Sequence, residues 1–126
     1  MSIFQYDLSI IIPIYNTEFE YLEKCLESLR DISHLQFEAI MVDDGSQSEY
    51  STALKELVSG ETFPLRLIVK ENGGQNSARE LGLHVSHGRY LLFLDSDDYI
   101  DPFLLERALD IAIDNEAQIL TFNYER

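Results

Sequence analysis

The chain has 126 residues, of which 9 are Lys or Arg and 23 are Asp or Glu, so its formal charge is −14. Nucleic acids and anionic membrane surfaces are bound by clustered cations, so this charge balance excludes nucleic acid as an expected partner and disfavours an anionic membrane surface. The single cysteine, Cys25, excludes a disulfide framework, and no apolar run is long enough to span a membrane. Since the N-terminus lacks a signal-peptide pattern, we expect one soluble cytoplasmic domain, with any contact to the inner face of a membrane left to parts outside this chain.

Short apolar runs alternate along the chain with segments whose apolar residues recur at helical spacing. In chain order, strands are predicted at residues 8–15, 37–42, 65–69, 90–94 and 118–122. The apolar stripes that predict the intervening helices start at Leu22, Tyr50, Ala78 and Leu105. Cys25 lies on the first of these stripes, so we expect it in the core.

Two of the predicted helices carry capping signals. Thr17, with Glu20 three residues later, is typical of a capping box, and Asp101 before Pro102 predicts an N-cap with proline at the first helical position. The alternation of strands and helices predicts an α/β fold with a mostly parallel sheet. Right-handed crossovers then bring the carboxyl ends of the strands to one edge, where ligands bind in such folds.

Polar and mostly acidic turns follow the predicted strands. Asp43 and Asp44 follow the second strand, and Asp95, Asp97 and Asp98 follow the fourth. Like charges at close range are unfavourable unless a cation lies among them, and a divalent cation with oxygen ligands is the simplest one. Such a metal would let an acidic protein bind a nucleotide diphosphate. Aspartate also suits turns for structural reasons alone, and that alternative stays open for the first pair.

Several motifs occur together in one order along the chain. Residues 10–16 read IIIPIYN, 42–46 VDDGS, 72–74 NGG, 77–79 SAR and 92–98 LFLDSDD. This set, with Gly88 before the last motif, resembles the family 2 glycosyltransferases over nearly the whole chain. The resemblance implies a Rossmann-like GT-A fold, a three-layer α/β/α sandwich. Residues 1–126 would be a single nucleotide-diphospho-sugar-binding domain that lacks the later acceptor-binding part of the family.

The resemblance also implies residues for the nucleotide. Those expected to pack around the nucleobase and ribose are Pro13, Ile14, Tyr15 and Asn16. Asp44, with Asp43 as the alternative, would accept a hydrogen bond from N3–H of uracil. Gly74 and Arg79 are expected beside the nucleotide.

The motif after the fourth strand resembles the DxD motif of the family, formed here by Asp95, Ser96 and Asp97. In that motif the first aspartate tends to face the ribose and the last ligates Mn²⁺ or Mg²⁺. Asp98 follows directly, so it is kept as an alternative metal ligand beside Asp97 and Asp95.

The implied activity is metal-dependent transfer of a sugar from a nucleoside diphosphate sugar, with UDP-sugar favoured. The acceptor would be a hydroxyl of a glycan or lipid-linked molecule, the anomeric carbon would be inverted, and the product would be a polysaccharide or cell-surface glycan. Family members continue past the fifth strand, so the catalytic base is expected beyond Arg126 and no catalytic residue is named here. A sheet left partly uncovered would also favour a homodimer.

Two other functions are compatible with parts of the pattern. A non-catalytic nucleotide-sugar-binding module would share every residue named above. A signalling receiver domain has a similar length and alternation, but it needs an aspartate pair after the first strand and a lysine after the fifth. The first predicted strand ends in Pro-Ile-Tyr-Asn and no lysine follows residue 118, so this rival is disfavoured.

Overall fold

Four parallel strands form the sheet in the computed structural model, which describes residues 4–115. The strands are β1 (Tyr6–Ile14), β2 (Phe37–Asp44), β3 (Leu65–Lys70) and β4 (Gly88–Phe93). They lie in the order β3-β2-β1-β4, and every neighbouring pair is parallel. The predicted mostly parallel sheet is thereby confirmed.

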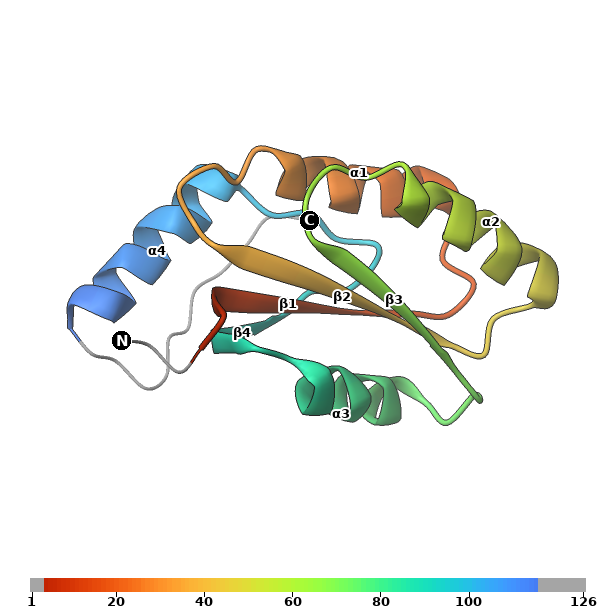
Figure 1. Cartoon of the computed structure of the whole chain (residues 1–126). Helices are drawn as coiled ribbons and strands as arrows, with labels where there is room; N and C mark the ends of the chain where they lie inside the picture. The colour runs from red at the N-terminus through yellow and green to blue at the C-terminus, as the bar shows by residue number, and fades with distance from the viewer. Residues whose placement is uncertain (1–3, 116–126) are drawn as a thin grey trace.

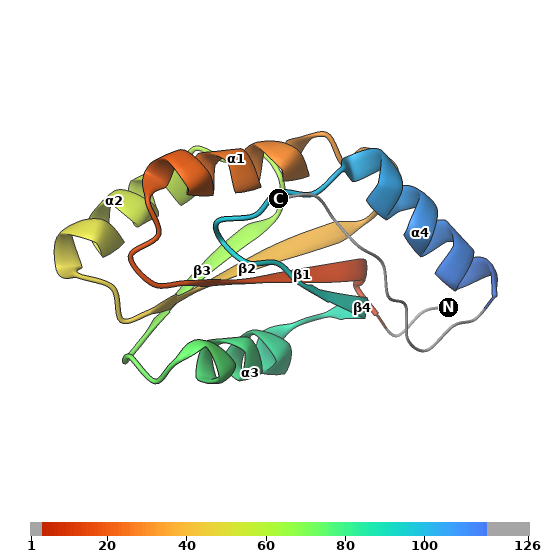
Figure 2. The ribbon, with the colours of Figure 1, turned by 180° about the vertical axis from the view of Figure 1, so that it is seen from behind.

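Helices cover both faces of this sheet, as Figures 1 and 2 show from opposite sides. The helices are α1 (Phe19–Arg30), α2 (Ser48–Ser59), α3 (Gln75–Val85) and α4 (Pro102–Asp114). In both views α1 and α2 lie on one face and α3 lies on the other, and α4 is on the side of α1. This is the predicted three-layer α/β/α sandwich. No helix among the described residues is long and apolar enough to cross a membrane.

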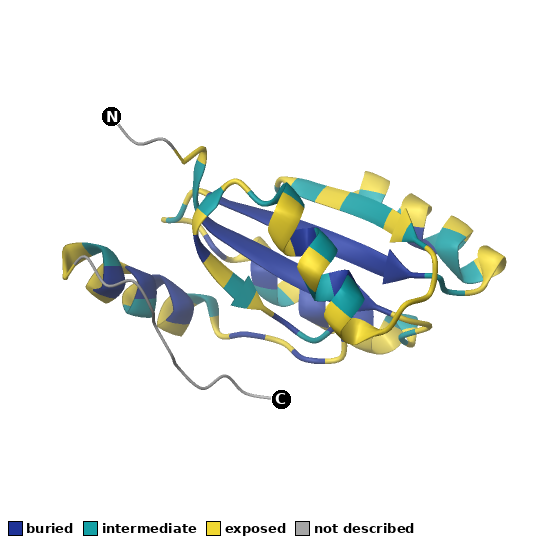
Figure 3. Ribbon diagram, turned by 90° about the horizontal axis from the view of Figure 1, so that it is seen from below, coloured by how far each residue is buried: buried dark blue, intermediate teal, exposed yellow. Residues whose placement is uncertain are grey.

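The two central strands are buried on both faces, because helices pack on each side of them. In Figure 3 β1 and β2 are almost wholly buried, whereas β3 has only intermediate and exposed positions and β4 has one buried position, Tyr90. Side chains of Ile10 and Ile12 join Cys25 in the larger core under α1. The smaller core on the α3 face is built on Ile40 and Val42. Cys25 is therefore a core residue, as expected, and burial raises its pKa to about 12.

The order in which the chain adds strands to the sheet reverses at β1, although all four strands are parallel. The chain moves outward from β1 through β2 to β3, and the connection through α3 then returns to the other side of β1. A receiver domain has the strand order 2-1-3-4-5, so this topology excludes that rival. In open α/β sheets, the crevice for a ligand forms at such a reversal, outside the carboxyl ends of the strands.

Each of the four described strands differs from its predicted bounds by one or two residues at one or both ends. Strand β2 extends to Asp44, because both aspartates pair with β3 in the ladder. Strand β4 starts at Gly88, where it pairs with Tyr6, and ends before Leu94. The fifth predicted strand, at 118–122, lies outside the described residues.

One of the two capping predictions is wrong. Helix α1 begins at Phe19 after Glu18, with no side-chain hydrogen bond at the cap, and the hydroxyl of Thr17 contacts Ser96 instead. A tertiary hydrogen bond has replaced the local one. The second prediction is confirmed, since Asp101 accepts from the first N–H groups of α4.

Helix α3 packs against β1 at a distance that only glycine permits. A Cβ at Gly82 would lie 2.5 Å from Cγ2 of the fully buried Ile11. We expect Gly82→Val to lower the free energy of unfolding by about 2 kcal/mol, because overpacking forces strained side chains or a backbone shift. Urea-induced unfolding measures this directly.

Gly60 provides the control, because a Cβ there has its nearest neighbour at 3.7 Å. The variant Gly60→Ala should stay within about 0.5 kcal/mol of the wild type. Equal stability of Gly82→Val and wild type would show that α3 is free to move away from β1.

Candidate functional site

A cleft of about 490 Å³ opens at the carboxyl edge of the sheet, where β1 and β4 reverse the strand order. Its walls come from the end of β1, the start of α1, the last residue of β2, the start of α3 and the turn after β4. The lining residues are Pro13, Ile14, Tyr15, Thr17, Glu18, Tyr21, Asp44, Gln75, Asp95, Ser96 and Asp97. The cleft thus combines an apolar and aromatic side with a carboxylate-rich side.

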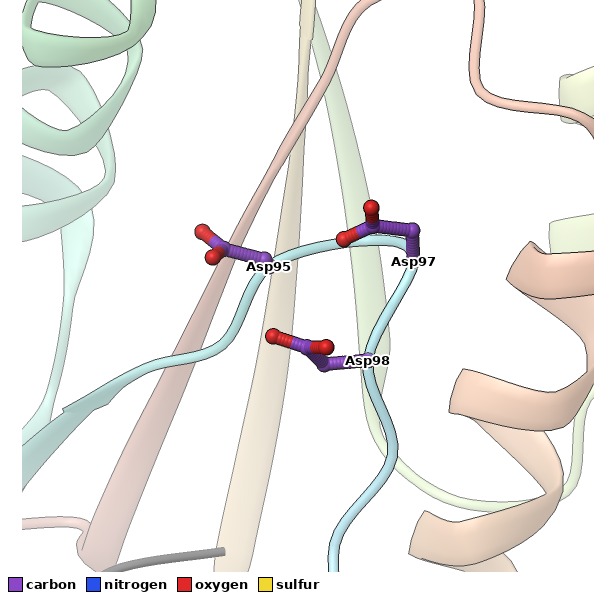
Figure 4. A group of neighbouring side chains, drawn as sticks. All are labelled: Asp95, Asp97 and Asp98. Carbon is purple, nitrogen blue, oxygen red and sulfur yellow. The ribbon is translucent and has the colours of Figure 1, made fainter. Parts of the chain in front are cut away.

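The turn after β4 gathers three carboxylates. The N–H of Asp98 donates to the carbonyl of Asp95 at 3.0 Å, and this bond closes the turn. In Figure 4 the carboxylates of Asp97 and Asp98 point back toward Asp95, and one oxygen from each of the three lies within 4.8 Å of the others. An all-oxygen set of this kind suits Mg²⁺ or Mn²⁺.

Arg79 on α3 supports the first of these carboxylates. Its Nη2 lies 3.4 Å from Asp95 Oδ1, and Gln75 donates to the same oxygen at 3.1 Å. The guanidinium also lies over the ring of Phe93, 5.8 Å from its centroid. Gln75 and Arg79, one turn apart on α3, therefore fix the orientation of Asp95.

The two aspartates at the end of β2 point to opposite faces of the sheet, because side chains alternate along a strand. Asp43 is fully buried on the α2 side, where it accepts from the N–H of Ser46 at 3.0 Å and from the hydroxyl of Ser51. Asp44 is on the α3 side and lines the cleft. The sequence left Asp43 and Asp44 as alternative acceptors for the nucleobase. In the structure only Asp44 lines the cleft, and Asp43 is buried on the other face of the sheet.

Asp44 is held by donors from the next strand and turn. Lys70 Nζ lies 2.7 Å from Oδ1, and the N–H groups of Gly73 and Gly74 donate to Oδ1 and Oδ2 at 2.9 Å each. Burial by itself would raise the pKa of Asp44, but these hydrogen bonds outweigh it, and the pKa lies below its ordinary value. The carboxylate is thus ionised at neutral pH and occupies the N-terminus of α3.

This arrangement requires a close approach of two turns. Gly45 has a φ of +71°, and a Cβ there would lie 2.5 Å from the backbone nitrogen of Asn72. Glycine adopts this left-handed conformation without steric cost. The motif that follows β2 therefore needs its glycine to bring Asp44 within reach of the turn after β3.

Hydrogen bonds also connect the loop after β1 with its neighbours. Thr17 Oγ1 lies 2.5 Å from the hydroxyl of Ser96, and the Tyr50 hydroxyl donates to the Thr17 carbonyl. Asn16, at a φ of +52°, donates from its N–H to Ser46 Oγ at 2.9 Å. These bonds join the apolar and acidic walls of the cleft into one framework.

The structure distributes the predicted site residues between the cleft surface and its support. The predicted residues on the surface are Pro13, Ile14, Tyr15, Asp44, Asp95, Ser96 and Asp97. The remaining ones, which are not among the lining residues, are Asn16, Asp43, Gly74, Arg79 and Asp98. The N–H of Gly74 donates to Asp44, so the anion at this helix terminus is the chain's own carboxylate.

Sequence reasoning missed the lining residues Thr17, Glu18, Tyr21 and Gln75. The sequence pattern predicts only a local helix cap for Thr17 and no role for Glu18. Tyr21 is exposed on α1, off its apolar stripe, and its aromatic ring was the available signal. Gln75 follows the Gly-Gly turn directly, and its place at the start of a helix near the edge of the sheet could have indicated it.

Comparison with known proteins identifies the family. Residues 9–126 match the family described as "Glycosyl transferase family 2". The chain belongs to this family. It is 35% identical over 117 residues to the putative glycosyltransferase EpsH of Bacillus subtilis, covering 93% of this chain and 33% of that protein. It is also 35% identical over 120 residues to the minor teichoic acid biosynthesis protein GgaB of the same organism, covering 92% of this chain and 13% of GgaB.

Among solved structures, the chain is similar to S. aureus TarS 1-349 in complex with UDP-GlcNAc. The TM-score is 0.75 at 30% identity, over 87% of this chain and 32% of that one. The sheet and helices described above match the GT-A fold of TarS. This family 2 chain spans a third or less of the length of each of these relatives.

The buried position of Asp43 predicts a structural role in this family 2 domain. We expect Asp43→Ala to lower the free energy of unfolding by about 1–3 kcal/mol, because the donors at Ser46 and Ser51 lose their acceptor. Asp97→Ala is the matched control: its side chain is exposed, and its loss should change stability by less than about 0.5 kcal/mol. Urea titration of both variants tests the distinction, and a reversed order of stability would contradict it.

Proposed function

We propose that this domain binds the donor of a sugar transfer, a UDP-sugar, in the cleft between the ends of β1 and β4. The observation that carries the proposal is the cleft itself, which joins an apolar and aromatic wall to a carboxylate cluster at the topological reversal. The TarS structure in complex with UDP-GlcNAc supports the choice of nucleotide sugar.

The nucleobase and ribose would pack against the end of β1, where Pro13, Ile14 and the exposed ring of Tyr15 line the cleft. Asp44 lies in the same wall and is ionised, so it acts only as an acceptor. An N–H at position 3 of uracil is a suitable donor to this carboxylate. The apolar residues would pack against the base, and the hydrogen bond to Asp44 would favour uracil.

The diphosphate would lie toward the turn after β4. The carboxylates of Asp95, Asp97 and Asp98 form a donor set that fits a divalent cation such as Mn²⁺ or Mg²⁺. When bound, such a cation neutralises the charge that develops on a departing diphosphate. Arg79 holds Asp95 in place for this role, and Thr17 holds the turn through Ser96.

We further propose that the longer protein transfers the sugar to an acceptor hydroxyl with inversion at the anomeric carbon. The acceptor would be a glycan or lipid-linked molecule in polysaccharide or cell-surface glycan synthesis. The similarity to GgaB, a minor teichoic acid biosynthesis protein, supports this class of product. The general base that accepts the proton of the hydroxyl would lie in the part of the protein outside this chain.

Binding of UDP should depend on the divalent cation and on Asp97. In calorimetric titrations, UDP should bind in Mn²⁺, and EDTA should weaken it strongly. Asp97→Ala should weaken binding in Mn²⁺ by at least about tenfold, a loss typical even of residues that only support a metal ligand. Because Asp97 is exposed, the variant should remain folded.

Asp110→Ala is the control for this experiment, since it removes another exposed aspartate, on α4. It should bind UDP as the wild type does. Equal UDP affinity in Mn²⁺ and in EDTA would contradict the metal-dependent part of the proposal. Absence of UDP binding under both conditions would contradict the proposed donor.

A further inference from the structure

Lys70 and Asp44 form a cross-strand ion pair beside the cleft. They are register partners in β3 and β2, and Lys70 Nζ lies 2.7 Å from Asp44 Oδ1. The exposed fractions of the two side chains are 17% and 5%, so the pair is largely shielded from water. Removing one partner of a shielded pair leaves the other charge uncompensated, which is a much larger perturbation than loss of a surface ion pair.

The donors around Asp44 are unequally distributed between its two oxygens. Oδ1 accepts from Lys70 Nζ at 2.7 Å and from the Gly73 N–H at 2.9 Å, which uses both of its lone pairs. Oδ2 accepts from the Gly74 N–H at 2.9 Å, and Asn72 Nδ2 is a weak second contact at 3.4 Å. That amide already donates to the Asp44 carbonyl at 2.9 Å. The remaining acceptor capacity of the carboxylate is therefore on Oδ2.

We propose that Lys70 is a positioning residue for nucleobase selection: it holds Oδ1 of Asp44 and leaves Oδ2 to accept an N–H from the base. This inference rests on the proposed function. Uracil presents N3–H to such an acceptor, whereas cytosine presents a lone pair at N3. A carboxylate that is ionised and held by Lys70 repels that lone pair, so the ion pair favours UDP over CDP although Lys70 does not line the cleft.

Without Lys70, the carboxylate loses its only cationic partner among the residues described and is more easily protonated. A protonated Asp44 has an O–H that can donate to N3 of cytosine. In a variant without Lys70, the preference for UDP over CDP should therefore fall, because CDP gains a hydrogen bond that UDP does not.

The ratio of the dissociation constants for CDP and UDP, measured by calorimetry in Mn²⁺, tests this inference. Both ligands carry the same ribose and diphosphate, so a general loss of structure changes both constants alike. We expect a 10- to 100-fold preference for UDP in the wild type, about the range for one hydrogen bond to a charged group. Lys70→Met should reduce the preference by about tenfold or more, and Lys70→Arg, which restores a cation, should keep most of it.

Arg66→Met is the matched control on the same strand. Arg66 pairs with Glu38 at 3.0 Å, on the same face of β3 but toward the opposite edge of the sheet. Arg66 is more exposed than Lys70, but its carboxylate partner is as buried as Asp44, so its removal also leaves a buried carboxylate without its cation and should leave the preference unchanged. If Lys70→Met proves unfolded by circular dichroism, Lys70→Gln takes its place, and its neutral donor should produce a smaller fall in the preference.

Two outcomes would overturn the inference alone: a wild type that binds UDP and CDP equally, or a folded Lys70→Met or Lys70→Gln variant that keeps the full preference for UDP. In both cases UDP still binds, and the proposed function stands. A wild type that binds neither nucleotide would overturn the proposed function together with the inference that rests on it.

Discussion

Strand β1 pairs in parallel with β2 along one edge and with β4 along the other, and the positions of the functional side chains follow from this pairing. Because the strands run in the same direction, the ends of β1, β2 and β4 lie at one edge of the sheet. Strands β2 and β3 are added on one side of β1 and β4 on the other. The connections from the ends of these strands therefore diverge at β1 and leave a cleft there. The parallel pairing of β1 with β4 thus places the acidic turn beside the apolar wall.

Asp44 and Asp97 differ in the charge compensation that residues 4–115 give them. Asp44 has Lys70 and two backbone N–H groups, so its charge is compensated in the folded protein. Asp97 takes part in none of the four ion pairs formed among residues 4–115, although two further carboxylates lie beside it. The first arrangement suits selection of a neutral base, and the second suits a divalent cation with an anionic ligand.

The sequence predicted the order of the four strands and four helices within residues 4–115 correctly, because apolar runs and helical stripes are local signals. It did not predict that Asp43 and Asp44 belong to β2, since aspartate is uncommon in strands and only the pairing with β3 extends the strand to them. Because side chains alternate along a strand, this extension places Asp43 and Asp44 on opposite faces of the sheet. The role of Thr17 was missed for a similar reason: its partner, Ser96, is distant in sequence, and local spacing predicts only a helix cap.

The central claim is that the cleft at the reversal binds a nucleotide with its base toward Asp44 and its diphosphate toward the acidic turn. A crystal structure of the protein with UDP and Mn²⁺ would test it most directly. We predict uracil N3 within hydrogen-bond distance of Asp44 Oδ2, and the metal bound by carboxylates of the turn that holds Asp95, Asp97 and Asp98. A nucleotide bound elsewhere, or bound in the cleft with its base at the acidic turn, would contradict this account.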